Sequence, residues 1–104
     1  MIEVRYYRTK DGREPFTDWL DSLTDQRGIK QIAQRVRRLR AGNLGDYKGS
    51  EGILELRFKS KGPGYRIYCG MDGQTLIILL CGGDKSSQKK DFKKAKEYWD
   101  DHNS

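Results

Sequence analysis

The chain has 104 residues and a formal net charge of +6, enough for one domain over residues 1–104 and too few for a second core. It contains no run of about 18 apolar residues, so we expect no membrane-spanning helix, and its polar start does not resemble a signal peptide, so we expect a cytoplasmic protein. Between residues 27 and 96, 17 Lys or Arg stand against six Asp or Glu, which favours a polyanionic partner such as nucleic acid.

The first part of the chain predicts one strand followed by two helices. The segment MIEVRYYR alternates apolar and polar residues, as a half-buried strand does. Pro15 suits the first turn of a short helix. Asp25 can cap a longer helix that runs through Leu39 or Arg40. The inner stripe of this longer helix consists of Ile29, Ile32, Ala33, Val36 and Leu39.

The remaining chain predicts three strands and a last helix. NLGDYKGSEG is expected to be a loop, and ILELRF and YRIYC are expected to pair as a hairpin. TLIILLCGG is almost continuously apolar, which indicates a central strand covered on both sides. DKSSQKKDFKKAKEYWDDH completes the chain as a helix. The expected fold is α+β, in the order β-α-α-β-β-β-α, with a small antiparallel sheet and helices packed on one face.

The longer helix is strongly basic, which leaves two interpretations open. One is a surface that binds DNA or RNA; the other is an outer face that is merely solvated. The basic residues are scattered around the helix, which favours the second interpretation. They are Arg27, Lys30, Arg35, Arg37, Arg38 and Arg40.

The expected hairpin places two arginines opposite each other. If residues 59–64 form the connecting loop, alternation puts Arg57 opposite Arg66 and Glu55 opposite Tyr68. Like charges in this position destabilise a sheet, so they need a reason. One possibility is a clamp in which both guanidinium groups hold a phosphate, with Tyr68 as a stacking surface and Lys59 and Lys61 nearby. The alternative is that Arg57 pairs with Glu55 or a helix carboxylate and Arg66 is simply exposed.

Several kinds of reactive site lack the residues they need. Two cysteines and one histidine make a poor ligand set, so we expect Cys69 and Cys81 to be reduced, buried thiols, with no metal and no cofactor. His102 is the only histidine, which excludes catalysis by a pair of histidines. Asp72 and Asp84 suit turns rather than a carboxylate cluster.

Four segments in this order resemble the RelE/ParE superfamily of toxins from type II toxin–antitoxin modules, and especially its HigB-like "addiction module killer protein" branch. They are DGREPFTDWLDSL, ELRF, GPGYRIYCG and LLCGGDKSSQKKDFKKAKEYW. The resemblance covers nearly the whole chain. It implies a RelE-like fold and, in RelE-like members, a metal-independent endoribonuclease that cuts mRNA on the ribosome and so inhibits translation and growth.

The resemblance also implies site residues. The arginines of the ELR and YR strands carry over to Arg57 and Arg66, and the basic residue after the last strand carries over to Lys85. Related toxins often have FxKK followed by Thr there, whereas GGDKSS lacks the aromatic residue and one lysine. We expect Arg57 and Arg66 to stabilise the transition state and Lys85 or Lys59 to transfer protons. The expected substrate contacts are Lys59, Lys61, Tyr65, Tyr68 and Ser86.

The resemblance implies partners and leaves alternatives. The expected partners are a cognate antitoxin of helix-turn-helix type, mRNA and the ribosome, with DNA reached only through the antitoxin complex and no membrane contact. ParE-like members with the same fold poison DNA gyrase, so fold alone does not decide the target. A third possibility is a basic module that binds nucleic acid without chemistry.

Overall fold

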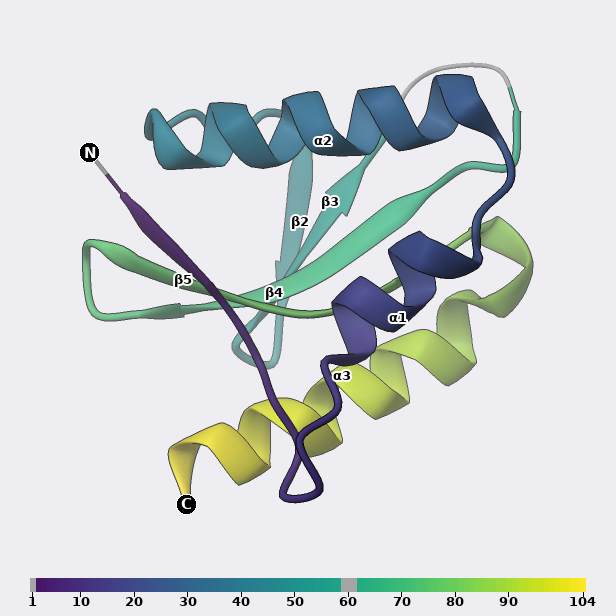
Figure 1. Ribbon diagram of the computed structural model, residues 1–104. Coiled ribbons are helices and arrows are strands. Elements are labelled where there is room, and N and C mark those ends of the chain that lie inside the picture. The colour runs from purple at the N-terminus through teal and green to yellow at the C-terminus, as the bar shows by residue number, and fades with distance from the viewer. Residues whose placement is uncertain (1, 59–61) are drawn as a thin grey trace.

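Five strands form one sheet in the order β1-β5-β4-β3-β2 (Figure 1). The computed structural model describes residues 2–58 and 62–104, so the predicted contacts Lys59 and Lys61 lie outside the described residues. Strand β1 pairs with β5 in parallel, and the other neighbours are antiparallel. The strands are β1 (Glu3–Tyr6), β2 (Tyr47–Ser50), β3 (Ile53–Arg57), β4 (Arg66–Asp72) and β5 (Leu76–Gly83).

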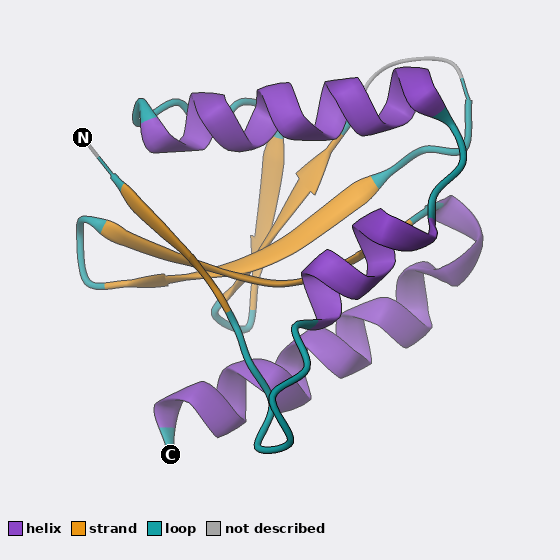
Figure 2. Cartoon of the chain, in the orientation of Figure 1, coloured by secondary structure: helices purple, strands orange, loops and turns teal. Residues whose placement is uncertain are grey.

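The helices cover both faces of this sheet, as Figure 2 shows. Helices α1 (Pro15–Ser22) and α2 (Gln26–Arg40) pack on one face, and α3 (Gln88–Asn103) packs on the other. The α+β class is therefore confirmed, but the prediction of helices on one face is corrected. The reason is visible in β5, whose buried residues alternate between the two faces, so that each face needs its own cover.

Two details of the sheet differ from the prediction. Residues 47–50, expected to be part of a loop, form the edge strand β2. This strand pairs with β3 so that Ser50 lies opposite Ile53. The sheet is mixed rather than antiparallel, because β1 lies beside the central strand β5. With β4 on one side of β5, the other side still has unpaired N–H and C=O groups, and β1 satisfies them.

Helix α2 begins and ends where the sequence predicts. Asp25 is the N-cap residue, and its Oδ1 accepts a hydrogen bond from the Gly28 N–H at 3.1 Å. Its Oδ2 accepts a second from the Tyr65 hydroxyl at 2.9 Å, which ties the start of α2 to β4. The helix ends at Arg40, as predicted. Because the helix N-terminus carries a partial positive charge, an ionised Asp25 stabilises it.

Both cysteines are buried and free, and they lie on opposite faces of the sheet. Cys69 belongs to the core under α1 and α2, whereas Cys81 belongs to the core under α3. The sheet separates the two sulfurs, so they are not positioned to form a disulfide with each other. Burial raises the pKa of each thiol to about 12, which keeps both in the unreactive thiol form.

No helix in residues 2–58 and 62–104 is long and apolar enough to span a membrane.

The last helix packs against the sheet and contacts a neighbouring turn. His102, near its end, stacks on Trp99 and lies 3.0 Å from the Asp72 carboxylate. The end of α3 is thus tied to the turn after β4.

Two tryptophans take their places because the sheet has glycine beneath them. A Cβ on Gly82 would overlap the ring of Trp19 in α1, and one on Gly70 would overlap the ring of Trp99 in α3. Each indole therefore lies directly on the backbone of a strand.

We expect Gly82→Ala to lower the free energy of unfolding by about 1–3 kcal/mol, because Trp19 has to move out of a well-packed site. Gly49→Ala is the matched control: it lies in the exposed strand β2, and its Cβ would meet Leu54 at an ordinary 3.7 Å. Urea titration followed by tryptophan fluorescence measures both. Equal stability of the two variants would contradict the close packing of Trp19 on β5.

Candidate functional site

The two strand arginines lie opposite each other, as predicted. Arg57 in β3 pairs with Arg66 in β4, and Glu55 pairs with Tyr68. All four side chains leave the sheet on the face that α3 covers, because Ile53 and Tyr68 belong to the core under that helix. The arginines lie where β3 ends and β4 begins. A cationic site at this end of the sheet is thus consistent with the register.

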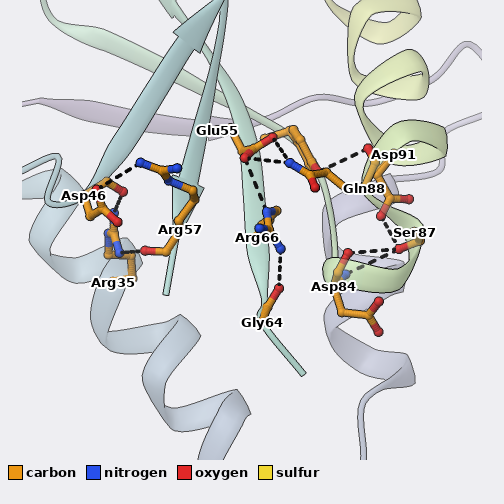
Figure 3. A network of polar contacts seen from close by, with 11 residues as sticks. Arg35, Asp46, Glu55, Arg57, Gly64, Arg66, Asp84, Ser87, Gln88 and Asp91 are labelled. Atoms are coloured by element: carbon orange, nitrogen blue, oxygen red, sulfur yellow. Dashed lines mark hydrogen bonds and ion pairs between the residues drawn. The ribbon is translucent and has the colours of Figure 1, made fainter. Parts of the chain in front are cut away.

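Arg66 is held by a buried carboxylate. Its Nε lies 3.3 Å from Glu55 Oε2, and its Nη1 donates to the Gly64 carbonyl at 2.9 Å (Figure 3). The side chains of Arg66 and Glu55 are only 15% and 9% exposed. Glu55 also accepts from Gln88 Nε2 of α3 at 3.2 Å. The guanidinium group is therefore fixed in position, and the carboxylate that fixes it is itself anchored to α3.

Arg57 turns to a different carboxylate. Its Nη2 lies 3.4 Å from Asp46 Oδ1, and its side chain is 41% exposed. Figure 3 shows the two arginines turned apart, one toward Asp46 and the other toward Gly64. The expected clamp, in which both guanidinium groups converge on one phosphate, is therefore not the arrangement in this structure. Arg57 and Arg66 mark two neighbouring positive positions.

The carbonyls beside Arg57 are tied together by a buried arginine of α2. Arg35 donates to the carbonyls of Arg57 at 2.8 Å, Leu44 at 2.9 Å and Asp46 at 2.6 Å. It also lies over the ring of Phe58, 5.3 Å from the ring centroid. By charge alone, this residue belongs with the scattered basic residues of the helix. It is instead buried and joins α2 to the end of β3.

Lys85 and Arg66 both lie close to Gly64. It begins the short 3₁₀ helix Lys85–Ser87, and its N–H donates to the Pro63 carbonyl at 3.1 Å. A Cβ on Gly64 would lie 3.2 Å from the Lys85 Cβ and 3.5 Å from Arg66 Nη1. The Lys85 side chain is exposed. The 3₁₀ helix thus places an exposed lysine close to Arg66, with Gly64 between them.

The other predicted contacts are placed less favourably. Ser86 is exposed, but its hydroxyl donates to Asp84 at 2.6 Å as part of the cap of the 3₁₀ helix. Tyr68 is completely buried, so no base can stack on it. Burial also raises the pKa of Tyr68, which leaves it neutral. Tyr65 lies in the core on the opposite face, bonded to Asp25. We therefore leave both tyrosines out of the site.

A hollow of about 400 Å³ opens beside Glu55, the partner of Arg66, on the same face of the sheet. Glu55 and Gln88 line it, and Phe92 contributes an apolar wall. Two lysines stand at its sides, one from the edge strand and one from α3. The full lining is Lys48, Ser50, Glu55, Gln88, Lys89 and Phe92. Its size falls in the range of small-molecule sites, and its charges suit an anionic ligand.

Sequence reasoning missed Glu55 and Gln88 as members of this site. We considered Glu55 only as a partner for Arg57, because neighbouring residues on one strand face are the obvious pair. The available signal was the diagonal: residues two apart across a strand pair still reach each other when the side chains are long. Among residues 2–58 and 62–104, no three His, Cys, Asp or Glu side chains gather as metal ligands would.

Similarity to known proteins covers most of the chain. The family model described as phage-derived protein Gp49-like (DUF891) matches residues 18–99. An uncharacterized protein of Haemophilus influenzae is 49% identical over 82 residues, which are 78% of this chain and 82% of that protein. The narrower resemblance to the HigB-like branch of RelE/ParE stays a prediction. The chain belongs to the Gp49-like family, which is associated with toxin–antitoxin modules.

Proposed function

We propose that the protein is the toxin of a toxin–antitoxin module and that it cleaves RNA at the site around Arg66. The observation that carries the proposal is the fixed guanidinium group of Arg66 beside the exposed Lys85, at one end of the sheet. A guanidinium group that is already in position stabilises developing negative charge without the cost of reorganisation. Membership of a toxin-associated family supports the biological setting.

The charges around α3 support an anionic substrate at this site. Cations near a helix N-terminus are normally unfavourable, because that end carries partial positive charge. Here Lys85 lies in the preceding 3₁₀ helix, and Lys89 and Lys90 lie in the first turn of α3, where Asp84 and Asp91 are the acids beside them. A bound phosphate offsets this repulsion and interacts with the same helix end. The lysines thus fit a surface that is occupied by a polyanion during function.

The chemistry that suits these residues is a transesterification, in which the 2′-hydroxyl of a nucleotide attacks the phosphate on the 3′-oxygen of the same ribose. The 2′-oxygen attacks the phosphorus and loses its proton, the bond from phosphorus to the 5′-oxygen breaks, and that oxygen gains a proton. The products are a 2′,3′-cyclic phosphate and a 5′-hydroxyl. Arg66 stabilises the charge on the phosphorane oxygens, and Lys85 takes part in proton transfer. No redox step or co-reactant is needed.

The proposed biological partners follow from the same assignment. We propose a cognate antitoxin, mRNA as the substrate and the ribosome as the place of cleavage, in the cytoplasm. The basic surface of α3 suits an acidic segment of the antitoxin. The complex would reach DNA through the antitoxin.

The test is expression of the chain with and without the adjacent gene, followed by sequencing of RNA 5′ ends. We expect growth arrest without the adjacent gene and new RNA ends that carry a 5′-hydroxyl. A gyrase cleavage-complex assay on the same cells separates the alternative target. Growth arrest with stabilised gyrase–DNA complexes and unchanged RNA would overturn the ribonuclease, and unimpaired growth with intact RNA would overturn the toxin as a whole.

A further inference from the structure

A second hollow, of about 430 Å³, lies on the other side of Arg57, between α2 and the end of β3. Its walls come from three separate parts of the chain: α2, the loop before β2, and the last residues of β3. The hollow is lined by Gln31, Gln34, Arg35, Arg38, Asn43, Gly45, Asp46, Arg57 and Phe58. Its volume is enough for one nucleotide unit.

The lining carries an excess of positive charge. Three arginines face one carboxylate, Asp46, which forms an ion pair with Arg57 at 3.4 Å. The Nε atoms of Arg35 and Arg57 are buried and have no hydrogen-bond partner among the described residues. Buried unpaired N–H groups are rare in folded proteins. One carboxylate therefore leaves the positive potential of this wall largely uncompensated.

Arg38 is the lining arginine best placed to meet a ligand. It is exposed near the end of α2, and no ion pair involves it among residues 2–58 and 62–104. Burial lowers the pKa of Arg35, Asp46 raises it, and the repulsion by Arg38, one turn away on the same helix, lowers it further. An anion between Arg38 and Arg57 relieves this repulsion.

We infer that this hollow binds the phosphodiester of a nucleotide next to the one that is cleaved. The inference rests on the proposed function and extends the site beyond Arg66. Arg57 connects the two places, because it lies opposite Arg66 in the sheet and also lines the hollow. A single strand that leaves Arg66 therefore passes Arg57 and enters the hollow beside α2. The divergence of the two guanidinium groups then has a reason, since each serves its own phosphate.

The binding test uses a short fluorescein-labelled single strand of 2′-O-methyl RNA, which lacks the nucleophile and cannot be cut. Fluorescence anisotropy gives its affinity for the purified full chain over a series of salt concentrations. We expect Arg38→Ala to weaken binding about 5- to 10-fold and to reduce the salt dependence by about 0.7 in the slope of log K against log salt. Arg37→Ala, an exposed neighbour outside the hollow, is the control and is expected to match the wild type.

Cleavage of unmodified RNA is measured separately, so that the two proposals fail independently. Loss of affinity in Arg38→Ala without any cleavage by the wild type would support the hollow and overturn the ribonuclease. Equal affinity and equal salt slope for Arg38→Ala, Arg37→Ala and the wild type would overturn the hollow and leave cleavage at Arg66 in place. Failure of the wild type to bind the modified strand would also overturn the hollow.

Discussion

Replacing Arg66 by glutamine is expected to lower the rate of RNA cleavage by about 10²- to 10³-fold, because it removes one fixed donor from the phosphorane. The side chain is 15% exposed and is held by Glu55 and the Gly64 carbonyl. It therefore loses little conformational entropy when the substrate binds. The measurement is the single-turnover rate on a short RNA, or the density of new 5′ ends on the ribosome.

This variant needs a control for folding, since it leaves Glu55 buried without its cation. The double variant Arg66→Gln, Glu55→Gln removes both charges and keeps the polar contacts to Gln88. We expect it to regain the stability of the wild type in a urea titration and to remain as slow as Arg66→Gln. Recovery of full cleavage in the double variant would show that Arg66 acts only through folding and would remove it from the proposed mechanism.

Replacing Arg35 by methionine is expected to lower the free energy of unfolding by about 3 kcal/mol or more. The guanidinium group donates to the partly buried carbonyls of Arg57, Leu44 and Asp46, and methionine removes all three hydrogen bonds. Of these acceptors, the Asp46 carbonyl keeps the N–H of Arg57 as a donor. Methionine keeps much of the contact with Phe58, so the loss reports chiefly on the hydrogen bonds. The measurement is the midpoint of urea unfolding at an unchanged m-value.

The matched control for Arg35→Met is Arg37→Met, which changes an exposed arginine of the same helix. We expect a change within about 0.5 kcal/mol for the control, as for most surface substitutions. A loss of similar size in both variants would mean that the helix propensity or net charge, rather than the buried contacts of Arg35, determines the result.

The register of the hairpin was predictable from the sequence, because alternation has a period of two and a slip of one residue would bury an arginine strand face. The pairing of Arg57 with Arg66 followed from that rule alone and is confirmed. The interior position of β5, between β1 and β4, followed in the same way from its apolar run. Backbone pairing was thus within reach of pattern reasoning.

Side-chain choices were not predictable in the same way. Register determines which Cα atoms lie opposite each other. It does not determine whether the Arg66 side chain turns toward Glu55, its diagonal neighbour, or toward Arg57, directly opposite. Strand β2 was missed because YKGS has a glycine and no apolar alternation, and its edge position makes no demand for one. The roles of Arg57, Arg66 and Lys85 stay predictions.

Arg35 shows a signal that was present and overlooked. It lies three residues after Ile32 and four before Leu39, which is the spacing of the inner stripe of α2. Its charge is typical of a surface residue, whereas its position in the stripe indicates burial. A charged residue at a core position of a helix predicts hydrogen-bond partners, because burial without them costs free energy. In this case the partners are the backbone carbonyls next to the proposed site.

The parallel pairing of β1 with β5 has a consequence for synthesis of the chain. Residues 3–6 find their partners only in residues 76–79, so the first strand made has to wait for one of the last. Contacts of such long sequence separation slow folding, because a large loop is closed before the pairing is gained. Lys85 and α3 follow later still. The sheet and the site around Arg66 and Lys85 are therefore complete only when translation of the chain is almost finished.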